Sequence, residues 1–124
     1  MKPYLFLFGF ATFVLVSCSK SSSSDVASNS TYKDVQPIFA QNCTGCHGGP
    51  HPKADVDLSS YIGIMKTANS PIAVVKPGDP DNSQMVQAIQ GINGMKRMPP
   101  GDNEPLDSAK ITAIENWIKA GAKP

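Results

Sequence analysis

The chain has 124 residues, of which 11 are Lys or Arg and 10 are Asp or Glu, so its formal net charge is only +1. Without Lys2, which lies in a predicted export signal, ten basic residues face ten acidic ones. A chain this close to neutral lacks the basic surface that nucleic acid binding requires, and its weak net field gives little long-range steering toward a highly charged partner.

Residues 1–17 are typical of a secretory signal. Lys2 precedes a nearly unbroken apolar run from Leu5 to Val16, which is too short to span a bilayer because a spanning helix needs about 20 apolar residues. The ending Leu15-Val16-Ser17-Cys18 resembles the lipobox of bacterial lipoproteins, in which the cysteine is lipidated and becomes the first mature residue. We therefore expect a lipid on Cys18; the alternative is an ordinary export signal with Cys18 a bystander just past the cut.

Residues 18–30 are rich in serine and contain almost no apolar side chains. Such a segment cannot bury enough surface to fold, so we expect a tether with a reach of about 20 Å. Residues 31–124 are expected to form one small domain, of a size at which a covalent cofactor often supplements a modest core. The prediction is an exported protein, lipid-anchored to a bacterial membrane; Ser19 resembles sorting signals that lead to the outer membrane, facing the periplasm.

The domain begins with a predicted amphipathic helix of two to three turns. The residues that recur at three- and four-residue spacing are Thr31, Tyr32, Val35, Ile38 and Phe39. Pro37 limits how far this helix is regular, and the chain then leads directly into Cys43. Glycines and prolines over 48–57 indicate a loop rather than a packed element.

Two short helices and one extended stretch are expected in the middle of the domain. Ser59 or Ser60 is placed to cap a helix over 61–67. The β-branched stretch within 71–77 is extended but has no second strand candidate to pair with, so no real sheet is expected. Another helix ends at Gly91, and its core-facing side chains are Met85, Val86 and Ile89.

The last helix has the clearest pattern. Asp107 is its predicted N-cap and Gly121 ends it. The side chains that share its apolar face are Ile111, Ile114, Trp117 and Ile118. The predicted fold class is therefore all-α, a small helical domain with long loops.

Cys43-Thr44-Gly45-Cys46-His47 matches C-x-x-C-H, the pattern of c-type haem attachment. Two thiols three positions apart can each bond one of the two vinyl groups of a porphyrin, and the adjacent imidazole then ligates the iron. We predict one covalent haem c on Cys43 and Cys46, with His47 as the proximal iron ligand. With Cys18 assigned to the lipid, all three cysteines then have a use.

Three other interpretations of the motif are weighed against this one. A thioredoxin-like C-x-x-C belongs in a βαβ unit, and no such pattern flanks Cys43. A zinc site with His51 as the fourth ligand has to place the adjacent Cys46 and His47 on one tetrahedral ion, which is difficult. A disulfide between Cys43 and Cys46 suits an exported protein but leaves His47 without a role.

A methionine thioether is a suitable sixth ligand because it is a soft, weak donor that favours ferrous iron. Met65 and Met85 lie on apolar helical faces, where packing explains them. Met98 is favoured as the distal ligand because the two prolines after it stiffen its loop, and Met95, which follows a glycine, is the second choice.

Three further polar residues lie near the predicted ligands. His51 is too close to His47 for the chain to wrap around the porphyrin to its opposite face, so bis-histidine ligation is disfavoured. Lys96 and Arg97 are expected either to meet haem propionates or a partner, or to be solvated loop residues. The sequence leaves both interpretations open.

Together these residues resemble the class I monohaem cytochrome c family over nearly all of 32–122. The segments that carry the resemblance are Val35-Gln36-Pro37-Ile38-Phe39, Cys43 to His47, Lys76-Pro77-Gly78-Asp79-Pro80, Met98-Pro99-Pro100-Gly101, and Ile114 through Trp117 to Gly121-Ala122. The resemblance implies that the first and last helices cross beside the haem, with Phe39 and Trp117 near the crossing. It also implies a ring held between His47 and Met98.

The predicted function is single-electron transfer, so the protein is not expected to be an enzyme. Its expected partners are redox proteins, and its expected contact with the membrane is the lipid on Cys18. The alternative is a haem-based ligand sensor, or a small haem enzyme, with an open iron site.

Overall fold

The structure is a computed structural model that describes residues 29–69 and 71–124. In these residues it contains four α-helices and one short 3-10 helix, and no strand. In chain order they are α2 (Tyr32–Asn42), η1 (Lys53–Asp55), α3 (Tyr61–Met65), α4 (Gln84–Gln90) and α5 (Ser108–Lys119). The predicted all-α fold with long loops is confirmed, and the nearest approach to a sheet is an isolated bridge between Thr31 and Lys123.

The predictions for the export signal 1–17, for Cys18 and for most of the tether 18–30 lie outside the described residues and stay predictions. In the part of the chain that is described, none of the helices has both the length and the apolar character needed to cross a bilayer.

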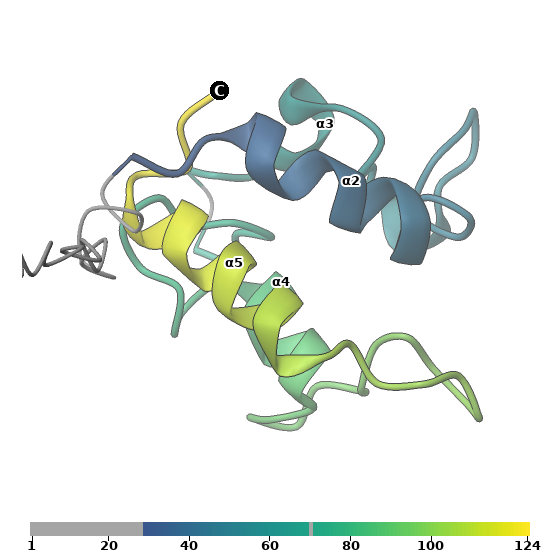
Figure 1. The fold of residues 1–124 in the computed structure, drawn as a ribbon. Coiled ribbons are helices and arrows are strands. Elements are labelled where there is room, and N and C mark those ends of the chain that lie inside the picture. The colour runs from purple at the N-terminus through teal and green to yellow at the C-terminus, as the bar shows by residue number, and fades with distance from the viewer. Residues whose placement is uncertain (1–28, 70) are drawn as a thin grey trace, which may run out of the picture.

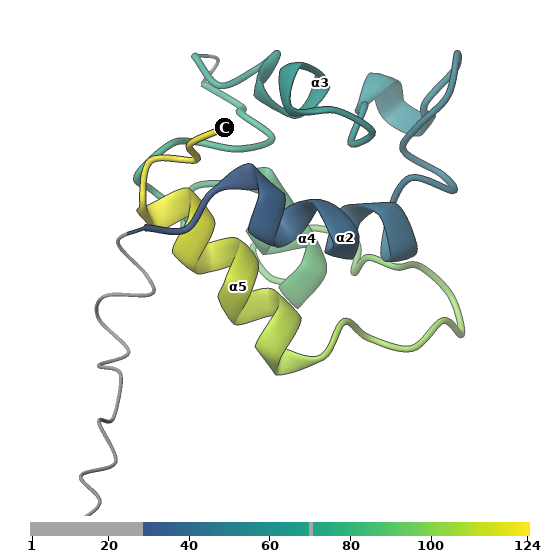
Figure 2. The same cartoon turned by 45° about the horizontal axis from the view of Figure 1, so that its top comes forward.

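Helices α2 and α5 pack against each other across the centre of the domain (Figures 1 and 2). Phe39 of α2 contacts Trp117 of α5, with ring centroids 5.9 Å apart and the planes inclined by 66°. Tyr32 lies against both, at 6.3 Å from Phe39 and 6.1 Å from Trp117. Phe39 and Trp117 are fully buried, so the packing of these two helices forms the aromatic centre of the core, as the family resemblance implied.

The remaining core surrounds this aromatic centre. Helix α4 packs against α5, and the buried side chains of the hydrophobic cluster are Val35, Phe39, Leu58, Ile64, Val75, Met85, Val86, Ile89, Leu106, Ile114, Trp117, Ile118 and Ala122. Met85 lies in this cluster, which fits its interpretation as a packing residue.

Local sequence signals set the helix ends largely as predicted. The Ser60 hydroxyl oxygen accepts a hydrogen bond from the Gly63 N–H at 3.1 Å at the start of α3, and the Asp107 carboxylate accepts one from the Lys110 N–H at 2.9 Å at the start of α5. Gly91 ends α4 with a φ of 68°, in the left-handed region that glycine enters without strain.

The end of α3 and the course of α2 differ from what the sequence pattern alone predicts. Helix α3 ends at Met65, two residues before the predicted end at 67. Helix α2 runs through Pro37 to Asn42. Proline costs the helix one backbone hydrogen bond, and the buried side chains of Val35 and Phe39 on either side of it outweigh that loss.

The segment 71–77 pairs in no sheet, as expected, but it is built of turns and bends rather than of the extended backbone that the sequence predicted. The carbonyl groups of Ala73 and Val74 accept hydrogen bonds from the N–H groups of Gln84 and Met85, at 3.1 and 3.0 Å. These two N–H groups belong to the first turn of α4, where no acceptor exists within the helix. The segment 71–77 therefore serves as a backbone cap for α4.

The C-terminal tail fastens the start of α2. The Lys123 carbonyl oxygen accepts hydrogen bonds from the Tyr32 N–H at 2.9 Å and from the Trp117 Nε1–H at 2.8 Å. The Tyr61 hydroxyl donates to the Ala122 carbonyl oxygen at 3.0 Å. This end of α2, opposite to Cys43, is thus closed by contacts within the polypeptide.

Candidate haem-binding site

The C-x-x-C-H motif follows directly on the last turn of α2. The Cys43 N–H donates to the carbonyl oxygen of Phe39 at 2.9 Å. The N–H groups of Cys46 and His47 both donate to the Cys43 carbonyl oxygen, at 3.1 and 2.8 Å. Because Phe39 is fully buried, the motif begins as a tight turn attached to the core rather than as part of a free loop.

The imidazole of His47 is oriented by a backbone carbonyl. Its Nδ1 lies 3.1 Å from the carbonyl oxygen of Lys53. A carbonyl oxygen only accepts hydrogen bonds, so this bond places the proton on Nδ1 and leaves the Nε2 lone pair free for a metal. The His47 backbone is also fixed, since its carbonyl oxygen accepts from the N–H of the buried Leu58 at 2.7 Å.

The two cysteines of the motif differ in exposure. Both are free thiols; Cys43 is half-buried and Cys46 is exposed. Burial raises the pKa of the Cys43 thiol to about 11, so this residue is a thiol rather than a thiolate at neutral pH. A thioredoxin-like site needs a lowered cysteine pKa, which is the opposite of the shift at Cys43. The structure has no disulfide between Cys43 and Cys46.

The zinc alternative requires four ligands to converge. Within residues 29–69 and 71–124, no group of three or more His, Cys, Asp and Glu side chains comes together as a metal site would require. His51 is exposed on the loop after His47. The structure therefore does not bring Cys43, Cys46, His47 and His51 together around one ion.

Met98 lies in the loop between α4 and α5. Its N–H donates to the carbonyl oxygen of Ala88, in α4, at 2.9 Å. The Met95 N–H donates to the Ile92 carbonyl oxygen at 3.0 Å, so its bond stays within the loop. Both side chains are half-buried. Of the two candidate ligands, Met98 is thus the one whose backbone is bonded directly to a helix.

The two predicted halves of the site lie on the same side of the molecule. In Figures 1 and 2 the C-terminal end of α2, which leads into Cys43, and the loop from α4 to α5, which carries Met98, both extend to that side. Haem c is held by two thiols that bond its vinyl groups and by an imidazole nitrogen and a thioether that ligate its iron, and all four kinds of group are present here. These residues fit that group, and the ligand roles of Cys43, Cys46, His47 and Met98 stay predictions.

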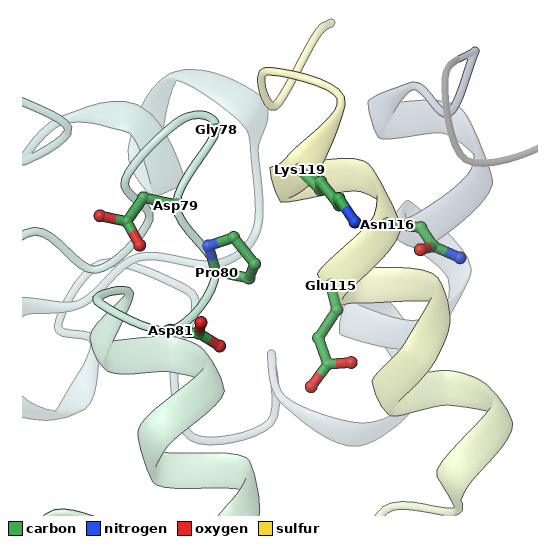
Figure 3. Close-up of a pocket in the computed structure, with 7 residues that line it drawn as sticks. All are labelled: Gly78, Asp79, Pro80, Asp81, Glu115, Asn116 and Lys119. Carbon is green, nitrogen blue, oxygen red and sulfur yellow. The ribbon is translucent and has the colours of Figure 1, made fainter. Parts of the chain in front are cut away.

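A polar groove lies elsewhere on the domain, between the turn at 78–81 and α5 (Figure 3). It has a volume of about 410 Å³, and its lining residues are Gly78, Asp79, Pro80, Asp81, Glu115, Asn116 and Lys119. The Asp79 carboxylate is engaged by the Lys76 ammonium at 2.8 Å and by the Asn82 amide, which hold the pKa of that carboxyl below its usual value. Glu115 accepts from the Gln90 amide at 2.7 Å. The contacts of Asp79 lie within the turn, and the contact of Glu115 lies on the surface of α5.

Lys53 is a residue of the site that the sequence did not predict. Its side chain has no part in orienting His47, because the acceptor is its backbone carbonyl oxygen. Every residue has such an oxygen, so no residue type at this position signals the contact. The only sequence signal is the loop itself, whose glycines and prolines allow the chain to turn back on the motif.

The fold and the motif together define a small all-α domain that presents C-x-x-C-H after its first described helix. The profile of a family described as Planctomycete cytochrome C matches residues 43–102, from the first cysteine of the motif through the Met98 loop. This match supports a cytochrome c-like family, and with it covalent haem c and haem-based electron transfer. No curated protein and no solved structure matched the chain.

Proposed function

We propose that this chain is a single-electron carrier, a c-type cytochrome with one haem. In this proposal Cys43 and Cys46 hold the haem through thioether bonds, and His47 and Met98 are the axial ligands of the iron. A lipid on Cys18 tethers the domain to a membrane. Met95 is the second choice for the distal ligand.

The observation that carries the proposal is the hydrogen bond between His47 Nδ1 and the Lys53 carbonyl oxygen. Lys53 is itself fixed, because its N–H donates to the Cys46 carbonyl oxygen at 3.0 Å. Both the N–H and the carbonyl oxygen of Lys53 are thus hydrogen-bonded to residues of the motif. A histidine that ligates a metal characteristically donates its other ring N–H to such an acceptor, which fixes the ring and raises its basicity.

When bound, haem supplies an iron that changes between the ferric and ferrous states by one electron. His47 would offer its Nε2 to the metal, because its proton stays on Nδ1 and is donated to the Lys53 carbonyl oxygen. Met98 would supply the iron with a weak, soft donor, which favours the ferrous state. The bond from the Cys43 N–H to the carbonyl oxygen of the buried Phe39 ties the start of the motif to the core.

The proposed location is the outer membrane, with the domain in the periplasm. Lipidated Cys18 is the anchor and residues 18–30 are the tether. The partners are redox proteins that dock on the domain. Because the mature chain is nearly neutral, recognition depends on local contacts more than on long-range electrostatic steering.

The test is to express the full chain together with haem attachment machinery, and to measure the mass and visible spectrum of the mature product. We expect the mass of polypeptide, lipid and one haem, with pigment that stays on the protein in acidified organic solvent. The Cys43→Ala, Cys46→Ala double variant is expected to lose the pigment. As a matched control, Cys18→Ser is expected to keep the pigment and lose the lipid.

A colourless wild-type product, or a pigment that the acidified solvent extracts, contradicts the proposal. Carbon monoxide separates the carrier from the sensor or enzyme alternative. A carrier with a methionine ligand shows a long-wavelength ferric band and binds carbon monoxide slowly. Rapid binding to the ferrous protein, without that band, supports an open iron site instead.

A further inference from the structure

Arg97 immediately precedes Met98 and differs from its neighbour Lys96. The Lys96 side chain is exposed, whereas Arg97 is half-buried. The stem of Arg97 packs against the end of α4: a Cβ added to Gly91 would lie 3.1 Å from the Arg97 Cβ. Arg97 is therefore held in place by the helical frame rather than extended into solvent.

The two terminal nitrogens of the Arg97 guanidinium have different environments. Nη2 donates to the carbonyl oxygens of Gly101 and Asn103, at 3.2 and 3.4 Å. Nη1 is buried and has no hydrogen-bond partner. One side of the group therefore fastens the loop that follows Met98, and the other side lacks an acceptor.

The part of the chain that the structure describes also supplies no counter-charge to this group. Among residues 29–69 and 71–124 the ion pairs join Lys76 to Asp79 and Lys110 to Asp107, and neither includes Arg97. The carboxylates of the same loop, Asp102 and Glu104, are exposed. A buried guanidinium nitrogen without acceptor or counter-charge is strongly unfavourable.

We propose that Nη1 of Arg97 donates to a propionate carboxylate of the haem, which makes Arg97 a positioning residue for both the haem and the Met98 loop. This inference rests on the proposed function, because it requires the haem to lie beside Met98. A carboxylate supplies the missing acceptor and the missing negative charge together, and the planar guanidinium fork matches its geometry. No acceptor within the described polypeptide does both.

The position of Arg97 in the chain supports this choice of partner. It is the residue directly before the proposed distal ligand, so a haem held by Met98 would lie beside the loop that contains Arg97. The Nη2 bonds to Gly101 and Asn103 close the loop over Pro99 and Pro100. A propionate bond at Nη1 links that closed loop to the cofactor.

The experiment compares full-length holoproteins carrying Arg97→Gln, Arg97→Lys and the matched control Lys96→Gln. Gln keeps an N–H donor for the loop carbonyls but removes the charge, and Lys keeps the charge but loses the fork. The first readout is the resonance Raman band of propionate bending, which reports hydrogen bonds to the propionates. The second is the ferrous-to-ferric ratio at the potential where the wild-type protein is half reduced.

We expect Arg97→Gln to shift the propionate band and to lower the ferrous-to-ferric ratio several-fold, because an uncompensated carboxylate stabilises ferric iron. Arg97→Lys should shift the band but lower the ratio less. Lys96→Gln should leave the band in place and change the ratio little, since an exposed charge is screened.

The wild-type haem content, from the mass measurement, decides the proposed function separately. In protein that carries the haem, a propionate band in Arg97→Gln that superimposes on the wild-type band overturns the role of Arg97. So does an equal change of the ratio in Arg97→Gln and Lys96→Gln. If Arg97→Gln does not accumulate, Arg97→Lys carries the same test: a shifted band supports the bond and an unchanged band refutes it.

Discussion

The two ends of α2 are completed in different ways. At its start, Tyr32 and Trp117 are fastened to the C-terminal tail by hydrogen bonds to the Lys123 carbonyl oxygen, and their rings lie 6.1 Å apart. At its far end, Cys43 opens a turn whose thiols are free. The polypeptide thus closes its own packing at one end and presents the free thiols of the motif at the other.

The described residues contain two buried polar atoms without a hydrogen-bond partner, and the two differ in charge. The Tyr32 hydroxyl is a neutral group beside the aromatic cluster, and Arg97 Nη1 is part of a cation. Leaving a neutral hydroxyl unpaired costs far less than leaving a buried charge unpaired. The first is a small defect of packing, whereas the second is the observation behind the proposed bond to a haem propionate.

The largest effect is expected from substitution of Met98, the proposed iron ligand. Met98→Ala should abolish the long-wavelength ferric band and open the iron to carbon monoxide, because the loop loses its thioether. Met95→Ala, a matched change three residues away, should preserve the band. Visible spectra of the two purified variants with and without carbon monoxide make the comparison. A band that survives in Met98→Ala and disappears in Met95→Ala transfers the ligand role to Met95.

The next largest effect is expected from substitution of Trp117, which lies where the start of α2 is closed by the C-terminal tail. Trp117 is fully buried against Phe39, so Trp117→Ala should lower the free energy of unfolding by about 3–5 kcal/mol. The control is Ile62, whose side chain is 82 % exposed. Ile62→Ala should change the free energy of unfolding by less than about 0.5 kcal/mol. Denaturant titration of the holoproteins measures both.

A milder variant keeps this test informative if Trp117→Ala does not fold. Trp117→Phe retains a ring but removes the Nε1–H that donates to Lys123. It should cost less than the alanine variant, and still more than Ile62→Ala, because packing volume and one hydrogen bond are lost together. Equal stability of Trp117→Phe and Ile62→Ala shows that the aromatic packing of α2 and α5 is not the stable part of the domain.

The smallest effect concerns the unpaired hydroxyl. Tyr32→Phe should leave the free energy of unfolding unchanged or raise it by up to about 1 kcal/mol, because it removes a buried group that makes no hydrogen bond. Tyr61→Phe is the matched control; it deletes the bond to the Ala122 carbonyl oxygen and should cost about 1 kcal/mol. A larger loss in Tyr32→Phe than in Tyr61→Phe shows that the Tyr32 hydroxyl has a stabilising partner.

The pH dependence sharpens the same comparison. Burial, and secondarily the charge of Asp57, raises the pKa of Tyr32 in the folded protein. The unfolded chain therefore loses this proton first, so the contribution to stability is present below about pH 10 and declines as the pH rises further. Tyr32→Phe should weaken the alkaline loss of stability, as measured by thermal unfolding between neutral and alkaline pH. An identical alkaline limb in both proteins contradicts this assignment.

Much of the fold was predictable because its signals are local. Ser60 and Asp107 act as N-caps and Gly91 as a C-terminal cap, each through contacts within one turn of its helix. Pro37 was less informative, since the cost of a proline is local but the packing that outweighs it is not. The end of α3 was misplaced by two residues for a related reason, because helix ends are set by weak local preferences.

Some features of the candidate site could also be predicted from the sequence, and others could not. C-x-x-C-H is readable because one cofactor requires two thiols and an imidazole at fixed spacing along the chain. The acceptor for His47 was not readable, because it is a backbone oxygen of Lys53 brought back by a loop. The state of Arg97 was also undecided, since solvated and cofactor-facing arginines look alike in a sequence.

The sequence by itself determined the helical class, the helix-capping residues and the chemistry of the motif, all of which depend on residues close together in the chain. The tertiary structure decided that Phe39 meets Trp117, that the His47 ring is held by Lys53 and that Arg97 Nη1 is buried without an acceptor. Each of these depends on how far the chain turns back on itself. That outcome is set by the burial of the whole core, which no short pattern encodes.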